Sequence, residues 1–158
     1  MSAIESFING SEQLTGIFGY WPSFHDAEVI DLHLWRGNVD RKQGSYVFPI
    51  LTLTMHCWEL TREVGATGHF VLRHHTRATL QFTNLFDDIQ IRGFNHQNAI
   101  FGLAITRLER TDGPTPYFSV VVEQSFGIGA EFTCTGIKVV SETPCDEDGR
   151  DRRQDVAP

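Results

Sequence analysis

A period of two in the hydrophobic residues recurs in short segments along most of this chain, and it constrains the fold more than any other feature. In "EVIDLHLWR", Ile30, Leu32 and Leu34 alternate with other residues, as they do in a half-buried β-strand. The segment "VFPILTLTMHCWEL" alternates in the same way from Leu51 to Cys57. Further strands are predicted at "ATLQF", "DIQIRGF", "IFGLAITRLER", "YFSVVVEQ" and "AEFTCTGIKVV".

The segments between these strands are rich in Gly, Asn, Asp and Pro, which favour turns. They read "RGNVDRKQGS", "NLFDD", "TDGPTP" and "SFGIGA". In the last strand the alternation slips by one residue at Gly136, which predicts a β-bulge there. About seven strands with short connections, and no helical pattern between them, predict a mainly β fold, built as an antiparallel sheet or sandwich.

Residues 2 to about 18 carry a helical pattern, and they predict a short N-terminal helical cap on the sheet. Ser2 and Glu5 have the spacing of a capping box, and Asn9-Gly10 is predicted to separate two short helices. The chain has 158 residues, which is within the usual size of one domain. We therefore expect residues 1–144 to form a single domain of the α+β type, dominated by strands.

The C-terminal segment "CDEDGRDRRQDVAP", residues 145–158, is almost entirely polar, and its composition predicts disorder. The cysteines at positions 57, 134 and 145 have no C-x-x-C spacing, and their odd number indicates reduced thiols. The N-terminus lacks a basic region followed by an apolar run, and no stretch approaches the roughly 20 apolar residues that span a bilayer. These features predict a cytoplasmic protein with no membrane partner.

The formal net charge is −7 at pH 7, and the isoelectric point is near 5.4. Binding to nucleic acid requires clustered Lys and Arg, whereas the 13 basic residues of this chain are spread thinly. We therefore expect no nucleic-acid partner. An acidic balance favours solubility and is compatible with steering toward a basic protein partner.

The sequence contains none of the common catalytic motifs: no G-x-S-x-G, no H-E-x-x-H, no phosphate loop and no dinucleotide fingerprint. Cys57 falls on the apolar face of its predicted strand, which favours burial over reactivity. We therefore expect no catalytic residue, no cofactor and no enzymatic activity. Several aromatic residues lie on or near polar faces, where they could anchor an interface: Trp21, Trp35, Trp58, Phe94 and Phe101.

The stretch "GYWPSFHDAEV" precedes the first strand, and two interpretations of it are open. In the structural one, Pro22 stops the helix, Trp21 and Phe24 are buried, and Asp26 accepts hydrogen bonds from backbone amides while His25 bonds a backbone carbonyl. In the functional one, these polar side chains contact a ligand or a partner.

A metal-dependent enzyme or a small-ligand-binding protein is the alternative function class. One metal ion needs at least three converging ligands, and a single sequence does not show such convergence. The candidate ligands would be His25, Asp26 and Glu28, joined by His33, His56 or His96 from other strands. We nevertheless expect no metal site.

Three segments together carry a resemblance to a known family: "FGYWPSFHDAEVIDLHL", "GFNHQNAI" and "FGIGAEFTCTGIKVV". They resemble the immunity protein 50 family of bacterial polymorphic toxin systems, over roughly residues 10 to 142. Members are small cytoplasmic proteins predicted to neutralise a cognate toxin. The resemblance thus implies a binding function without catalysis and a toxin protein as the partner.

The residues that match the family lie in the first two segments. They are Trp21, Pro22, Phe24, His25, Asp26, Glu28, Phe94, Asn95, Gln97 and Asn98. The resemblance assigns no role to any of them. From this set we predict six partner-binding residues: Trp21, His25, Asp26, Glu28, Phe94 and Asn95.

Overall fold

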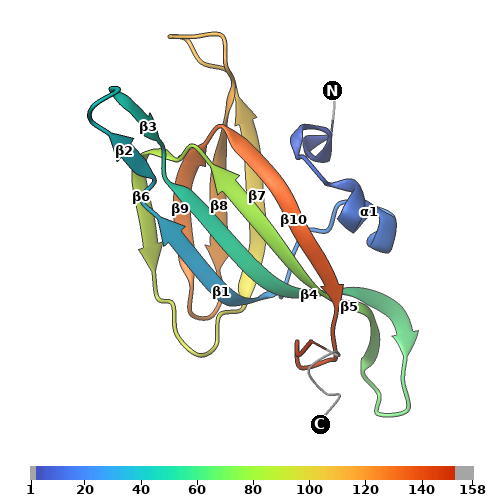
Figure 1. The fold of residues 1–158 in the computed structure, drawn as a ribbon. Coiled ribbons are helices and arrows are strands. Elements are labelled where there is room, and N and C mark those ends of the chain that lie inside the picture. Colours follow the sequence, from blue (N-terminus) through green and yellow to red (C-terminus); the bar gives the residue numbers. More distant parts are fainter. Residues whose placement is uncertain (1–2, 152–158) are drawn as a thin grey trace.

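A computed structural model describes residues 3–151 of the chain as two antiparallel sheets of four strands each, packed face to face (Figure 1). The first sheet has the order β1-β4-β5-β10, and the second has the order β6-β9-β8-β7. A small hairpin, β2-β3, follows β1. The strands of the first sheet are β1 (Glu28–Trp35), β4 (Ile50–Val64), β5 (Phe70–Thr83) and β10 (Gly136–Pro144). The others are β2 (Asn38–Asp40), β3 (Ser45–Val47), β6 (Phe86–Arg92), β7 (Ile100–Leu108), β8 (Tyr117–Gln124) and β9 (Gly129–Cys134).

One hydrophobic core fills the space between the two sheets. Leu51, Leu53 and Met55 of β4 are fully buried and alternate with half-buried threonines, as the sequence predicts. From β5, the ring of Phe82 meets Phe132 of β9 edge to face, with ring centroids 5.0 Å apart. Burying each such side chain stabilises the fold by about 1.5–3 kcal/mol, so the shared core holds the two sheets together.

The mainly β, antiparallel architecture with a short N-terminal helix is confirmed, although the described residues contain ten strands rather than about seven. Two of the additional strands form the β2-β3 hairpin, where the sequence predicts only a turn. Its residues are all exposed, so no buried face marks them as strands. The third comes from the predicted last strand, which the structure divides into β9 and β10.

The predicted bulge at Gly136 is wrong, because the slip in alternation marks a change of sheet. Phe132 and Cys134 are buried in β9 of the second sheet, whereas Ile137 and Val139 are buried in β10 of the first sheet. The two sheets face each other, so the inward parity reverses when the chain crosses between them. The irregularity of β10 lies instead between Val139 and Ser141.

A similar correction applies to the start of the first strand. The pairing of β1 with β4 shifts register between Val29 and Asp31. Val29 therefore takes the buried position, and Ile30, which the alternation predicts to be buried, is exposed. Leu32 is half-buried and packs against the core.

The N-terminal cap consists of a 3-10 helix, η1 (Ile4–Phe7), and a short α-helix, α1 (Glu12–Phe18). Asn9 lies between them and pairs with β10, since its N–H donates to Ile137 O (3.0 Å) and its carbonyl accepts from Val139 N–H (2.8 Å). The predicted break at Asn9-Gly10 is thus confirmed, whereas the predicted capping box involves Ser2, which lies outside the described residues. Within residues 3–151, no helix has the length and hydropathy needed to cross a membrane.

The C-terminal segment is ordered where the structure describes it. Cys145 is buried, its N–H donates to His75 O (3.0 Å), and it forms a β-bridge with Asp151. In the turn between them, Gly149 packs on the His56 ring and its carbonyl accepts from Arg77. The buried Cys145 side chain and these backbone bonds thus anchor residues 145–151, the first part of the segment for which the composition predicts disorder. Residues 152–158 lie outside the described residues.

Candidate partner-binding site

The segment between α1 and β1 joins the helical cap to the sheets. The helix ends at Gly19, in the left-handed conformation that favours glycine (φ 80°). Pro22 and Phe24 are buried, and Phe24 belongs to the core. Trp21 is half-buried and packs edge to face on Phe24, with ring centroids 5.6 Å apart. The predicted burial of Phe24 is therefore confirmed, and that of Trp21 is partial. The prediction that Pro22 stops the helix is wrong, because the helix already ends at Gly19.

Two residues of this segment have left-handed backbones, Phe24 (φ 60°) and Asp26 (φ 65°). For a bulky residue such as phenylalanine, this conformation is rare and costs about 1–3 kcal/mol. Hydrogen bonds hold the turn in place: Ala27 N–H donates to Phe24 O, and Asp26 N–H donates to Ile100 O, both at 3.0 Å. The chain thus buries the Phe24 ring and presents the next two side chains outward.

Those two side chains form an exposed pair. His25 Nδ1 lies 3.2 Å from Asp26 Oδ2, and the side chains are 55% and 64% exposed. The His25 ring also contacts the exposed Phe101 ring edge to face, at 5.1 Å between centroids. Within residues 3–151, neither side chain bonds a backbone group, so the predicted bonds from Asp26 and His25 to the backbone are wrong. Asp26 instead meets the imidazole of His25. Such an exposed pair contributes little to stability.

The loop 93–99, which contains Phe94 and Asn95, lies beside the start of β1. The side chain of Asn98 is buried, and its Nδ2 donates to Val29 O (3.4 Å) while its Oδ1 accepts from Asn95 N–H (2.8 Å). Val29 N–H donates in return to Asn98 O (2.9 Å). The fold therefore brings the two family-matching segments together, with Asn98 as the connecting residue.

The six predicted partner-binding residues differ in how they are presented. His25, Asp26, Phe94 and Asn95 are exposed. Asn95 also shapes its loop, because its Oδ1 accepts from Gln97 N–H (2.7 Å). Trp21 and Glu28 are half-buried. The role of all six in binding a partner stays a prediction.

A cleft of about 420 Å³ opens next to the His25–Asp26 turn. Its walls come from the end of α1, the segment that follows it, and strands β4 and β5. Aromatic and aliphatic side chains dominate the lining, and no Lys or Arg is among the described residues that form it. The residues most relevant to binding are Tyr20, Phe24, Asp26, Trp58, Leu60 and Leu72.

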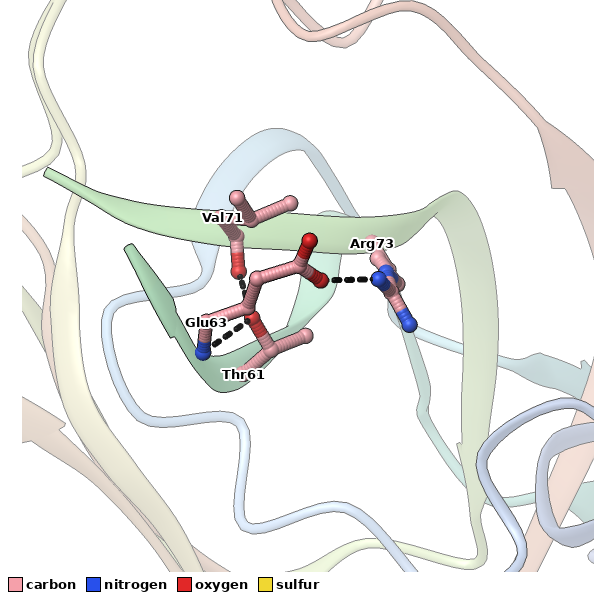
Figure 2. A network of polar contacts seen from close by, with 4 residues as sticks. All are labelled: Thr61, Glu63, Val71 and Arg73. Carbon is pink, nitrogen blue, oxygen red and sulfur yellow. Dashed lines mark hydrogen bonds and ion pairs between the residues drawn. The ribbon is translucent and has the colours of Figure 1, made fainter. Parts of the chain in front are cut away.

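One wall of the cleft belongs to a projection that we call the β4-β5 arm, residues 58–73. In Figure 1 the ends of β4 and β5 extend beyond the rest of the first sheet. The pairing shifts register between Leu60 and Val64, so β4 has extra residues there. Figure 2 shows how Thr61 bridges the irregularity: its hydroxyl donates to Val71 O (2.6 Å) and accepts from Glu63 N–H (3.3 Å).

Both acidic residues of the arm are paired, whereas several of its apolar residues are exposed. Glu63 pairs with Arg73 (Figure 2), and Glu59 pairs with His74 at 2.8 Å. Leu60 is 65% exposed and Phe70 is 56% exposed, and the neighbouring Val64 and Leu72 are exposed too. Leu60 pairs with Leu72, and Val64 pairs with Phe70, so these exposed apolar residues make the arm a candidate interaction surface. The hydrophobic periodicity of the sequence does not predict this surface, although apolar residues recur in the mostly polar stretch from Leu60 to Leu72.

His25 and Asp26 lie together, but the other candidate metal ligands do not join them to form a set of three within the described residues. His56 is buried, and its Nε2 lies 2.9 Å from His75 Nδ1. Burial, with a smaller contribution from His75, lowers the pKa of His56 to about 4. His33 is exposed on β1, and His96 is exposed in the loop 93–99. Across residues 3–151, no group of three or more His, Cys, Asp or Glu side chains is arranged to hold a metal ion.

Cys57 lines the cleft, but its thiol is poorly suited to act as a nucleophile. Burial raises its pKa to about 12, and the nearby Cys145 adds to this effect. The thiolate is the reactive form, so the group is inert at neutral pH. What the cleft offers is an aromatic and aliphatic surface with a carboxylate at its edge, which is suited to binding.

Comparison with known proteins supports the resemblance seen in the sequence. The family model for Immunity protein 50 matches residues 10–145. No curated protein and no solved structure matches the chain. The matched range contains the His25–Asp26 turn, the loop 93–99, the cleft and the arm. The chain belongs to the immunity protein 50 family.

Proposed function

We propose that this chain is an immunity protein that binds a cognate toxin domain and neutralises it by occlusion, without catalysis. The observation that carries this proposal is the surface formed by the exposed His25–Asp26 turn, the cleft and the apolar arm, in a chain of the immunity protein 50 family. Occlusion requires no reactive group, only a surface complementary to the toxin.

The composition of this surface supports a protein partner. Specific protein interfaces bury about 800 Å² on each side and have an apolar centre within a polar rim. Here Tyr20, Leu60 and Phe70 provide exposed apolar anchors. The His25–Asp26 pair and the salt bridges of the arm provide the polar rim. The strained backbone at Phe24 is consistent with this assignment, because such strain concentrates at functional sites.

The charge of the chain supports a basic toxin surface as the target. With a net charge of −7, this protein attracts a positively charged partner and gains in association rate. A toxin that acts on nucleic acid would present such a surface at its substrate site. The gain in rate should fall as salt concentration rises, because exposed charges are screened.

The partners and location follow from the same properties. Cys57 and Cys134 are free, buried thiols, which suits the reducing cytoplasm. The toxin is the proposed partner, and neither nucleic acid nor a membrane is proposed as one. The protein therefore acts on a toxin that is present in the cytoplasm.

Co-expression with a toxin domain encoded by a neighbouring gene tests the proposal. Cells producing both proteins should survive, and a stable complex should be recovered from them. The Leu60→Arg variant should lose protection, because it places a charge in the apolar surface of the arm. Val140→Arg is the matched control, since Val140 is exposed on β10 and is not part of the cleft or the arm.

Both variants should keep the circular dichroism spectrum and melting temperature of the parent chain. Toxicity that persists in the presence of folded parent protein would overturn the proposal. A toxin that is covalently altered after contact with the chain, detected by mass spectrometry, would replace occlusion with an enzymatic mechanism.

A further inference from the structure

The lining of the cleft beside the arm contains one acidic side chain. Asp26 is the only carboxylate among its described lining residues, and none of them is Lys or Arg. The Oδ2 atom of Asp26 faces the His25 ring, whereas Oδ1 has no partner among the residues that the structure describes. Glu59, next to Trp58 in sequence, is held by His74 at 2.8 Å. One carboxylate oxygen thus stays available to a donor that enters the cleft.

Aromatic groups form much of the remaining lining. Tyr20 is exposed, and Trp58 is half-buried. The Trp58 ring is supported by the buried His56 ring, edge to face at 4.9 Å, so its orientation is fixed before a partner arrives. Aromatic faces attract cations, most strongly in a partly desolvated site. Leu60 and Leu72 add an aliphatic surface on the arm side.

From this combination we infer that the cleft receives an arginine side chain of the partner protein. The methylene groups of this arginine would pack on Leu60 and Leu72. Its guanidinium would stack on the aromatic rings and donate hydrogen bonds to the Asp26 carboxylate. Arginine fits better than lysine, because a guanidinium is planar, stacks on aromatic faces and is more weakly hydrated than an ammonium. This inference rests on the proposed function and specifies what the bound surface of the toxin presents.

The backbone of the turn supports this assignment. Phe24 and Asp26 both have left-handed backbones, and the buried Phe24 ring anchors the turn on which the carboxylate stands. Among the described residues, the Asp26 side chain makes no bond to the backbone, so its carboxylate is not used to hold the turn. Asparagine tolerates the same conformation, so Asp26→Asn removes the charge without disturbing the turn.

A titration of the full chain with N-acetyl-arginine N-methylamide, followed by NMR, tests the inference without the toxin. Saturable shifts are expected at the amides of residues 24–27 and at the Trp58 indole. The matching lysine and norleucine amides serve as comparisons. The arginine probe should bind at least about fivefold more tightly than the norleucine probe, since only the former offers a cation to the aromatic rings and to Asp26.

Two variants separate a specific site from a general charge effect. Asp26→Asn should weaken binding of the arginine probe by about fivefold or more. Asp31→Asn removes an equal charge from an exposed position of β1 that is not in the cleft, and it should leave binding unchanged. Equal affinity for the norleucine probe, no effect of Asp26→Asn, or no saturable shift at these residues would each overturn the inference. Tighter binding of the lysine probe would overturn the choice of arginine.

The toxin itself supplies an independent measurement. In the complex, Asp26→Asn and substitution of the contacting toxin arginine by methionine should each weaken binding, and their combined effect should be less than additive. Full neutralisation by a chain that does not bind the arginine probe would refute the cleft assignment and leave the proposed function intact. Binding of the probe without any protection against the toxin would refute the proposed function instead.

Discussion

His56 and His75 share a hydrogen bond in which Nε2 of the first lies 2.9 Å from Nδ1 of the second. One nitrogen must donate and the other must accept, so the two rings cannot both be protonated without losing it. His56 is buried, and Trp58 packs against its ring. The pair therefore supports one wall of the cleft only while at least one imidazole is neutral.

Acid should destabilise the protein through this pair. The unfolded chain binds a proton at His56 as pH falls through 6.5, whereas the folded protein, with a pKa of about 4, does so only near pH 4. The unfolded state thus holds more protons in this window, and the free energy of unfolding should fall by about 2 kcal/mol between pH 7 and about pH 5. Urea unfolding at the two pH values measures it. His56→Gln should reduce the dependence, and His33→Gln, at an exposed position, should not.

Phe24 should be the most sensitive position of the turn. Phe24→Ala removes a buried ring from the core and should cost about 3–5 kcal/mol. Phe101→Ala, in the exposed ring beside His25, is the control and should change stability by less than about 0.5 kcal/mol. Denaturant unfolding of both variants gives the comparison. Similar losses in the two would mean that the turn is not anchored through Phe24.

Substitutions of Asp26 should change the stability of the protein through the backbone conformation at this position and not through lost hydrogen bonds. Asp26→Ala places a residue with a Cβ and no compensating side chain at φ 65°, which should cost about 1–2 kcal/mol. Asp26→Gly and Asp26→Asn should be close to the parent chain, because both residues adopt this region readily. Melting temperatures of the three variants decide the matter. An equally large loss in all three would point to the carboxylate as the stabilising group.

Thr61 should control the rigidity of the β4-β5 arm. Thr61→Val removes the hydroxyl that donates to Val71 O and accepts from Glu63 N–H. The free energy of unfolding should fall by about 1 kcal/mol, and the arm should become more mobile. Hydrogen exchange in residues 60–72 should become faster, and affinity for the toxin should fall. Thr67→Val, in the exposed turn at the end of the arm, is the control. Unchanged exchange in Thr61→Val would show that strand pairing alone holds the arm.

The C-terminal turn, residues 145–151, should contribute more to the stability of the protein than its polar composition predicts. A chain that ends at Pro144 loses the buried Cys145 and uncovers the His56 ring, so its melting temperature should drop by roughly 3–8 °C. A chain that ends at Asp151 keeps both contacts and should match the full chain. Calorimetry of the two truncated forms tests this, and equal stability would show that residues 145–151 add nothing to the fold.

The sequence predicts those parts of the fold in which burial follows a simple period. Leu51, Leu53 and Met55 show this, since their alternation identifies both the strand and its inner face. Gly136 shows the limit: a slip in period looks the same whether a strand bulges or crosses to the facing sheet. Only the partners of β9 and β10 distinguish the two.

The candidate site is predictable only in part, for a related reason. His25 and Asp26 can be identified as candidates because they are adjacent polar residues, but their exposure depends on the left-handed backbones at Phe24 and Asp26. The cleft requires Tyr20 and Leu72, which lie in distant segments and meet only after folding. Neighbouring residue types in the sequence can therefore identify single candidate residues. They do not predict a cleft, because a cleft forms only when distant segments pack together.

The bridge between Asn9 and Lys138 also affects whether copies of the molecule can associate through the edge of the first sheet. The outer strand of a sheet exposes unpaired N–H and C=O groups, which can recruit a strand from another molecule and start a fibre. At β10, the N–H of Val139 and the carbonyl of Ile137 are already bonded to Asn9. A second molecule could add a strand there only by first displacing the helical cap, so the N-terminal segment shields the chain against polymerisation along this edge.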